Sequence, residues 1–250
     1  MEIRWESCMK KDNLAKVLIL AVLGFNILPV LAFTLDKPPM LNRAKNISQQ
    51  KSEDYVNPLY PAKYTPSYIQ TIKKEYEIVS KDEIFYVALD MLKDTNGDFS
   101  RRAALGNNLT GKPVKIEFKD LSQINKNYAD YDALGWKRGS RLYIYINQKH
   151  NTSPAIAIAA LLSHENLHQD EFNSLSEETY AWTMEAAVWC ELLKLYPDYK
   201  LGPDSLVQRE NTLKTLFERG NYTNKYIKKS VYSNAGYQNL PESSPGFEAL

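Results

Sequence analysis

Residues 153–168 read Ser-Pro-Ala-Ile-Ala-Ile-Ala-Ala-Leu-Leu-Ser-His-Glu-Asn-Leu-His, and we expect this stretch to form the centre of the fold. The eight residues from Ala155 onward are all apolar, and a helix that is apolar on every side is a core helix. Ser153 followed by Pro154 is typical of a helix start, with serine as the N-cap and proline in the first turn. We therefore expect a buried helix over residues 153–171 with a polar motif near its carboxyl end.

The polar motif runs His-Glu-Asn-Leu-His over residues 164–168, and the chain has only one other histidine, His150. On a helix, His164 and His168 lie one above the other on the same face, so both imidazoles can reach one Zn²⁺ ion. Glu165 lies beside them, where it can take a proton from a water molecule that the metal activates. The motif therefore predicts a metal site with two ligands and a general base.

A third metal ligand is expected from the next helix, which we predict over residues 175–195. A catalytic zinc ion takes three protein ligands, and no histidine follows the motif, so the third ligand should be a carboxylate. Ser174 and Glu177 match a capping box, in which the glutamate turns back toward the helix start. Glu178 is then free and is the first choice as ligand, with Glu177 as the alternative. The non-metal interpretation of Glu178 is an acid favoured by the helix dipole.

This pattern resembles the gluzincin group of zinc metallopeptidases, and in particular the small minigluzincins. In that group, a His-Glu-x-x-His motif is followed on the next helix by a glutamate with a small residue three positions later. The resemblance covers about residues 140–195 of this chain. It implies a zincin-like fold in which His164, His168 and Glu178 bind zinc and Glu165 is the general base.

One position departs from the pattern of the thermolysin-like members of that group. They carry an aspartate that orients a ligand histidine, and this chain has Trp182 there. The orienting role then falls to Glu185 or to a backbone carbonyl.

Two strands are expected beside the motif helix. Residues 141–147 alternate in polarity and are rich in β-forming residues, and residues 114–118 form a second strand. The fold class is therefore α+β, mainly helical, with a small sheet. The resemblance implies that an edge strand packed on the active-site helix pair holds an extended peptide, which places Tyr143 and Tyr145 at the substrate. A purely structural strand is the alternative.

A hydrogen-bond donor is also needed near the oxyanion that develops during peptide hydrolysis. His150, Tyr145 and Tyr180 are the candidates. We rank His150 first because it lies on the loop that enters the motif helix; a solvated loop histidine is the alternative interpretation.

The order of segments along the chain indicates a single catalytic domain. Residues 1–32 are typical of a signal peptide or an N-terminal anchor, and residues 14–33 would hold an uncleaved chain in the membrane. Residues 33–65 are polar and rich in proline, which predicts an extended linker or arm. Residues 66–236 are predicted to form the zincin-like domain, and residues 237–250 an irregular C-terminal tail.

Two further helical segments are expected from apolar residues at helical spacing. One covers residues 65–93 with a break near Ser80, and the other covers residues 203–218.

The charge and cysteine content of the chain exclude several classes of protein. The 250 residues carry 31 Lys+Arg and 30 Asp+Glu; residues 1–32 hold four and three of these, which leaves 27 of each. This balance gives no sign of nucleic acid or of an anionic surface as a partner. Cys8 lies in the signal segment, so the mature chain keeps Cys190 alone and forms no internal disulfide.

We therefore expect a secreted or periplasmic zinc-dependent peptidase that binds one Zn²⁺ per chain and acts on a peptide or protein. Membrane contact is expected only if the N-terminal segment stays attached. Two alternatives stay open. One is a non-enzymatic, zinc-stabilised binding protein of the cell envelope, and the other is a helical envelope domain without a metal.

Overall fold

Seven α-helices and three strands make up residues 59–248, the part of the chain that the computed structural model describes. The helices are α2 (Pro66–Tyr76), α3 (Glu83–Met91), α4 (Asp98–Ala104), α5 (Ala155–Glu165), α6 (Leu175–Leu195), α7 (Ser205–Arg219) and α8 (Lys225–Ser233). The strands are β1 (Lys115–Lys119), β2 (Ala133–Arg138) and β3 (Arg141–Asn147). The predicted class, a mainly helical α+β fold, is confirmed. The expected signal peptide or anchor, and the linker up to residue 58, lie outside the described residues.

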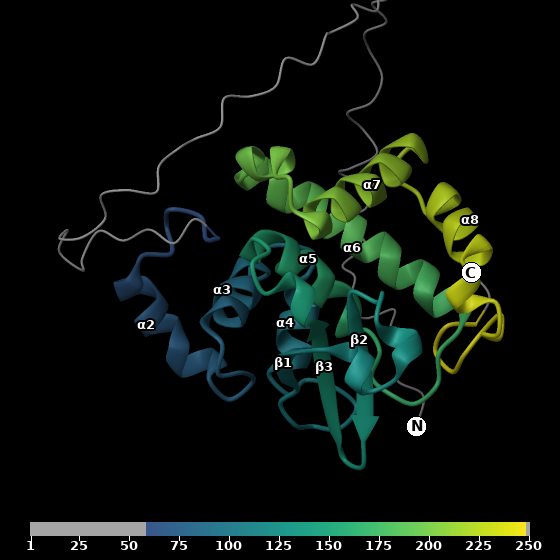
Figure 1. Cartoon of the computed structure of the whole chain (residues 1–250), viewed down its shortest axis with the longest axis horizontal. Helices are drawn as coiled ribbons and strands as arrows, with labels where there is room; N and C mark the ends of the chain where they lie inside the picture. Colours follow the sequence, from purple (N-terminus) through teal and green to yellow (C-terminus); the bar gives the residue numbers. More distant parts are fainter. Residues whose placement is uncertain (1–58, 249–250) are drawn as a thin grey trace, which may run out of the picture. The chain divides into compact units, whose positions relative to one another are not determined.

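The core helix α5 lies between the other elements, with α3 and α6 packed against it and the sheet beside it (Figure 1). All of its residues are buried, as its uninterrupted apolar sequence predicts. Helices α7 and α8 pack on α6, on the side that leads to the C-terminus. No helix in residues 59–248 has the length and apolar character needed to cross a membrane.

The start of α5 differs from the prediction. The Ser153 hydroxyl donates to Oδ2 of Asp204 at 2.8 Å and does not cap the helix, whose N-cap residue is Pro154. The N–H of Ala155 instead donates to the carbonyl oxygen of Leu59 at 2.9 Å. A residue that lies far earlier in the chain therefore closes the amino end of the core helix.

The end of α5 also differs, because the helix stops at Glu165 rather than at the predicted residue 171. The side-chain amide of Asn166 donates to the carbonyl oxygen of Leu162 at 2.9 Å. The next two backbone N–H groups bond three residues back instead of four, at 2.9 and 3.3 Å. His168 therefore lies in a tightened turn just beyond the helix.

The sheet has β3 in the centre, parallel to β1 and antiparallel to β2. The strand predicted at residues 141–147 is confirmed, and the strand predicted at residues 114–118 begins and ends one residue later. β2 was not predicted, because a glycine and two consecutive cations interrupt its alternation. The expected edge strand, residues 141–147, is therefore central, and β2 is the edge strand that packs on α5.

The carboxyl-terminal part of the chain packs on α6. The predicted helix over residues 175–195 is confirmed, α7 lies close to its prediction, and α8 was not predicted. Residues 237–248 are largely irregular, as expected, but they pack on the folded domain. The N–H groups of Leu175 and Ser176 at the start of α6 donate to backbone carbonyls of this segment at 2.9 and 3.1 Å.

We expect Ile158→Ala to lower the free energy of unfolding by about 2–5 kcal/mol, because the smaller side chain leaves a cavity in the core packed around α5. Urea denaturation followed by circular dichroism measures this. Leu195→Ala is the control, since Leu195 is 60% exposed at the end of α6 and its loss should cost less than about 0.5 kcal/mol. Equal losses in the two variants would contradict the central position of α5.

Candidate metal centre

The two histidines of the motif and Glu178 of α6 form one largely buried group that can hold a metal ion. Nε2 of His164 lies 3.6 Å from Oε2 of Glu178, and Nε2 of His168 lies 3.6 Å from Oε1 of the same carboxylate. Two ligands that are each about 2.0–2.1 Å from one ion in tetrahedral geometry lie roughly 3.3–3.4 Å apart. Each imidazole is thus close to the separation from Glu178 that two ligands of one cation have, and one ligand atom from each of the three residues lies within 4.8 Å of the others.

The tightened turn after α5 keeps the two imidazoles together although His168 is outside the helix. The ring centroids of His164 and His168 are 5.2 Å apart, with an interplanar angle of 61°. The two rings therefore stay adjacent although the backbone bonds after Glu165 reach three residues back instead of four.

The Nδ1 of each imidazole lies within hydrogen-bond distance of a buried carboxylate, to which its N–H can donate. Nδ1 of His164 lies 3.0 Å from Oε2 of Glu185, and Nδ1 of His168 lies 3.0 Å from Oε1 of Glu177. A hydrogen bond from Nδ1 to a carboxylate fixes the ring and its tautomer, and leaves Nε2 as the free electron pair for a metal. The sequence left Glu185 or a backbone carbonyl to replace the aspartate that is missing at Trp182. In the structure, Glu185 is the group that contacts a motif histidine, His164.

Glu177 holds a histidine instead of completing a capping box. The Ser174 hydroxyl caps α6 as predicted, accepting from the N–H of Glu177 at 3.1 Å. The Glu177 side chain, however, does not return to the helix start; its Oε2 accepts from the Ser244 hydroxyl at 2.9 Å while its Oε1 faces His168. The N–H of Ser174 donates to Asn173 Oδ1 at 2.7 Å instead. Glu177 thus orients His168, a candidate ligand, and Glu178 is the acid that lies within the group.

The carboxylate of Glu178 is oriented but not fully satisfied. Oε1 accepts from the side-chain amide of Asn173 at 2.6 Å, and the Tyr237 hydroxyl also approaches this carboxylate. No well-formed hydrogen bond to the buried Oε2 is found among the described residues. Burial would raise the pKa of Glu178, but the charges of His168 and His164 outweigh this and lower it. A buried carboxylate whose two oxygens each face one imidazole is an environment that a cation would complete.

His168 is shifted in the opposite direction. Burial alone would lower its pKa, but the hydrogen bond to Glu177 and the charges of Glu178 and Glu165 raise it to about 9. The surroundings therefore favour positive charge at this position. The donor set of two imidazole nitrogens and one carboxylate oxygen fits a divalent cation such as zinc.

Glu165 lies at the end of α5 beside the edge strand. A Cβ added to Gly135 would lie 3.5 Å from Oε2 of Glu165 and 3.4 Å from Cβ of His168, so glycine lets β2 approach the motif closely. Burial raises the pKa of Glu165, and the charges of Glu178 and Glu185 add to this while the histidines oppose it. A carboxylate with a raised pKa beside a group that could hold a metal ion is suited to accept a proton.

The structure places His150 away from the role of oxyanion donor. The residue is buried, 1% exposed, and not a solvated loop histidine. Its Nε2 lies 2.7 Å from Oδ1 of Asp132 and its Nδ1 lies 3.4 Å from the Ser153 hydroxyl. Both ring nitrogens therefore face internal partners, and the ring serves the local structure.

The two tyrosines expected at the substrate lie on the central strand β3. Gly135 pairs with Ile144, whereas Tyr143 and Tyr145 pair with the neighbours of Gly135. Because side chains alternate along a strand, Tyr143 and Tyr145 lie on the face opposite the one that meets Glu165. They stack on each other with ring centroids 5.9 Å apart. Tyr143 still helps to line a small hollow together with Glu165 and His168, so the substrate role of the two tyrosines stays a prediction.

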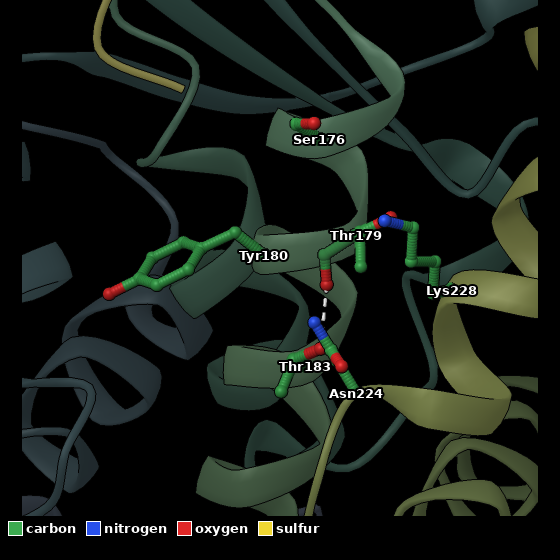
Figure 2. Close-up of a pocket in the computed structure, with 6 residues that line it drawn as sticks. All are labelled: Ser176, Thr179, Tyr180, Thr183, Asn224 and Lys228. Atoms are coloured by element: carbon green, nitrogen blue, oxygen red, sulfur yellow. Dashed lines mark hydrogen bonds between the residues drawn. The ribbon is translucent and has the colours of Figure 1, made fainter. Parts of the chain in front are cut away.

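A separate hollow lies between α6 and α8. It is lined by Ser176, Thr179, Tyr180, Thr183, Asn224 and Lys228 (Figure 2). The hydroxyls of Thr179 and Thr183 donate to carbonyls one turn earlier in α6, at 2.7 and 2.6 Å. Tyr180 lines this hollow and packs on Phe247, with ring centroids 5.8 Å apart. No histidine, cysteine or carboxylate lines this hollow. Tyr180, the third candidate for the oxyanion donor, is one of its lining residues.

Sequence reasoning missed Tyr237 and Ser244, which approach the group from the C-terminal segment. The Tyr237 hydroxyl accepts from Nε1 of Trp182 at 3.2 Å, and burial together with the negative charge of Glu178 raises its pKa. No spacing signal links either residue to the motif, because each lies more than fifty residues beyond Glu178. Only the packing of residues 237–248 on α6 reveals them.

No family model, no curated protein and no solved structure matches this chain. The geometry of the buried group therefore carries the functional argument alone.

Glu177→Ala should weaken Zn²⁺ binding by about 10- to 100-fold, because His168 loses the acceptor that fixes its ring. Competition against a chromophoric chelator measures the affinity. The matched control is Glu191→Ala, which removes another α6 carboxylate, one that accepts from the N–H of Asn96 at 2.8 Å. Its affinity should equal that of the wild type; an unchanged affinity in Glu177→Ala would contradict the orienting role.

Asp132 should make stability sensitive to acid. Burial alone would raise its pKa, but the hydrogen bond from His150 and the charges of Arg209 and Lys149 lower it below its ordinary value. Its contribution is therefore present above the unfolded pKa of about 3.9 and is lost as pH falls toward the folded pKa. We expect the free energy of unfolding of Asp132→Asn to fall less than that of the wild type between about pH 4 and pH 2. Denaturant titrations across this range measure it; the exposed Asp94→Asn is the control, and parallel curves for Asp132→Asn and wild type would refute it.

Proposed function

We propose that this protein is a zinc-dependent peptidase. The observation that carries the proposal is the convergence of two Nε2 atoms on the carboxylate of Glu178, each 3.6 Å away, while both Nδ1 atoms bond buried acids. Two histidines and one glutamate are a ligand set of catalytic zinc sites, which keep the fourth position open for water or substrate. The same residues support a relationship to the gluzincins and a zincin-like packing of α5 on α6.

Zinc bound there would polarise the carbonyl of the scissile peptide and lower the pKa of a water molecule to about 7. Glu165 would take the proton from that water as it attacks the carbonyl carbon, and would pass it to the departing amine. The raised pKa of Glu165 suits both halves of this transfer. Its position between the histidines in sequence, and against β2 in space, supports this role.

The edge strand β2 is suited to hold an extended peptide. The N–H of Asn147 donates to the carbonyl oxygen of Asp132 at 2.8 Å, so in the antiparallel pair every second residue from Asp132 bonds to β3. The backbone groups of Ala133, Gly135 and Lys137 then point away from β3. No strand within residues 59–248 pairs with that side. A substrate strand could add there, beside Glu165.

The oxyanion donor in this proposal is Tyr237. Its hydroxyl oxygen accepts from Nε1 of Trp182 at 3.2 Å, and the same hydroxyl is a hydrogen-bond partner of Glu178. A hydroxyl held on the carboxylate of the candidate metal group could turn its proton toward a substrate oxyanion. A secreted or periplasmic location and a peptide or protein substrate belong to the same proposal.

Glu165→Gln should slow peptide hydrolysis by about 10²–10⁴-fold, because it removes the proton acceptor. The full chain, loaded with Zn²⁺, is assayed on a quenched fluorescent peptide library, and the Zn²⁺ affinity of each variant is measured in parallel. Glu218→Gln, an exposed glutamate of α7, is the control and should retain wild-type activity. A chelator should abolish the activity and added Zn²⁺ should restore it.

Equal rates for Glu165→Gln and wild type would sink the peptidase proposal. A chain that binds Zn²⁺, gains thermal stability from it and cleaves no member of the library would instead be a zinc-stabilised binding protein.

A further inference from the structure

One arginine of α7 lies between the metal centre and the edge strand. Nη1 and Nη2 of Arg209 both donate to Glu185, with 3.0 Å between Nη2 and Oε2. Nε of Arg209 lies 3.1 Å from Oδ2 of Asp132, and Nη1 also donates to Oε1 of Glu210 at 2.9 Å. The side chains of Glu185 and Glu210 are fully buried. A single guanidinium therefore holds three carboxylates from three parts of the chain.

Glu185 depends on Arg209 to be an effective partner of His164. An ionised carboxylate that is buried without a counter-charge is costly, and it would take up a proton instead. Glu185 is fully buried, and both of its carboxylate oxygens accept from the guanidinium of Arg209. Arg209 thus fixes Glu185 as the acceptor for Nδ1 of His164.

Asp132 depends on the same arginine at the other end. It is the residue immediately before β2, and its backbone carbonyl makes the last bond of the β2–β3 pair, to Asn147. Its carboxylate lies 3.1 Å from Arg209, 3.0 Å from Lys149 and 2.7 Å from His150. The start of the edge strand is therefore anchored on the guanidinium that anchors Glu185.

Two further residues keep the guanidinium in place. The ring of Trp182 lies 5.6 Å from the guanidinium of Arg209. Trp182, which stands where the thermolysin-like pattern has an aspartate, therefore supports the arginine that stabilises Glu185. Burial and the charge of Glu185 raise the pKa of Glu210, which favours its protonated form. The arginine is then shared mainly by two charged acids, Glu185 and Asp132.

We propose that Arg209 is a positioning residue that couples the metal centre to the edge strand. Through Glu185 it sets the orientation of His164, and through Asp132 it sets the alignment of β2. This coupling rests on the proposed function, because it concerns the same metal and the same strand. Loss of the guanidinium should disturb both features, whereas loss of either carboxylate should disturb only one.

The experiment measures two quantities on the full chain: Zn²⁺ affinity, by competition with a chromophoric chelator, and hydrogen exchange of residues 133–138, by mass spectrometry. Arg209→Met should weaken Zn²⁺ binding by about 10- to 100-fold and speed the exchange. Glu185→Gln should weaken the affinity alone, and Asp132→Asn should speed the exchange alone. Arg209→Lys keeps the charge but loses the planar fork, so both effects should be smaller than in Arg209→Met.

The matched control is Arg219→Met, at the end of the same helix, where the guanidinium lies 4.7 Å from the ring of Tyr226. Both of its quantities should equal those of the wild type. A purely structural role for Arg209 would lower stability without this selective pattern or its partial rescue by lysine.

An affinity for Arg209→Met within about twofold of the wild type overturns the coupling, as does weakened binding with unchanged exchange. If Arg209→Met fails to fold, Arg209→Lys decides, because its two effects must still occur together. A wild-type chain that binds no Zn²⁺ defeats the proposed function itself. If the wild type binds Zn²⁺ and Arg209→Met binds it equally tightly, only the coupling is contradicted.

Discussion

The pairing of each motif histidine with a buried carboxylate is the constraint on which this protein depends. Nδ1 of His164 bonds Glu185 and Nδ1 of His168 bonds Glu177, each at 3.0 Å, so both rings present Nε2 to Glu178. Neither ring could be held this way by α5 alone, because both carboxylates belong to α6. The packing of α6 on α5 is therefore also the assembly of the candidate metal centre.

Burying this arrangement of charged groups lowers the stability of the fold. Four glutamates of α5 and α6 are buried around two histidines, and taking a charge out of water costs several kcal/mol per ion before any pairing. Arg209 and the imidazoles offset part of that cost, and a bound cation would offset more. Metal binding and folding should accordingly be coupled, because the apolar core of α5 must support a charged end.

Local signals predicted the elements whose ends are set by nearby residues. The Ser174 cap fixed the start of α6, and the alternating residues 141–147 gave β3 without error. The end of α5 was missed because the Asn166 side chain competes for a helix carbonyl. β2 was missed because its pairing with β3, and not its own sequence, makes it a strand.

The residues of the candidate site also fall into two sets, those that local sequence signals predicted and those that they did not. The motif itself and Glu178 could be picked out from helical spacing within a short stretch. The role of Glu177 could not, since it depends on Ser244, and the roles of Tyr237 and Arg209 depend on segments that return from far along the chain. Such contacts are products of tertiary packing, which a single sequence does not display.

The most direct measurement is an anomalous-difference map from crystals of the protein grown with Zn²⁺. The account predicts one strong peak about 2.0–2.1 Å from Nε2 of His164, Nε2 of His168 and a carboxylate oxygen of Glu178. Fully occupied zinc at other surface carboxylates, with no density between these three side chains, would contradict it.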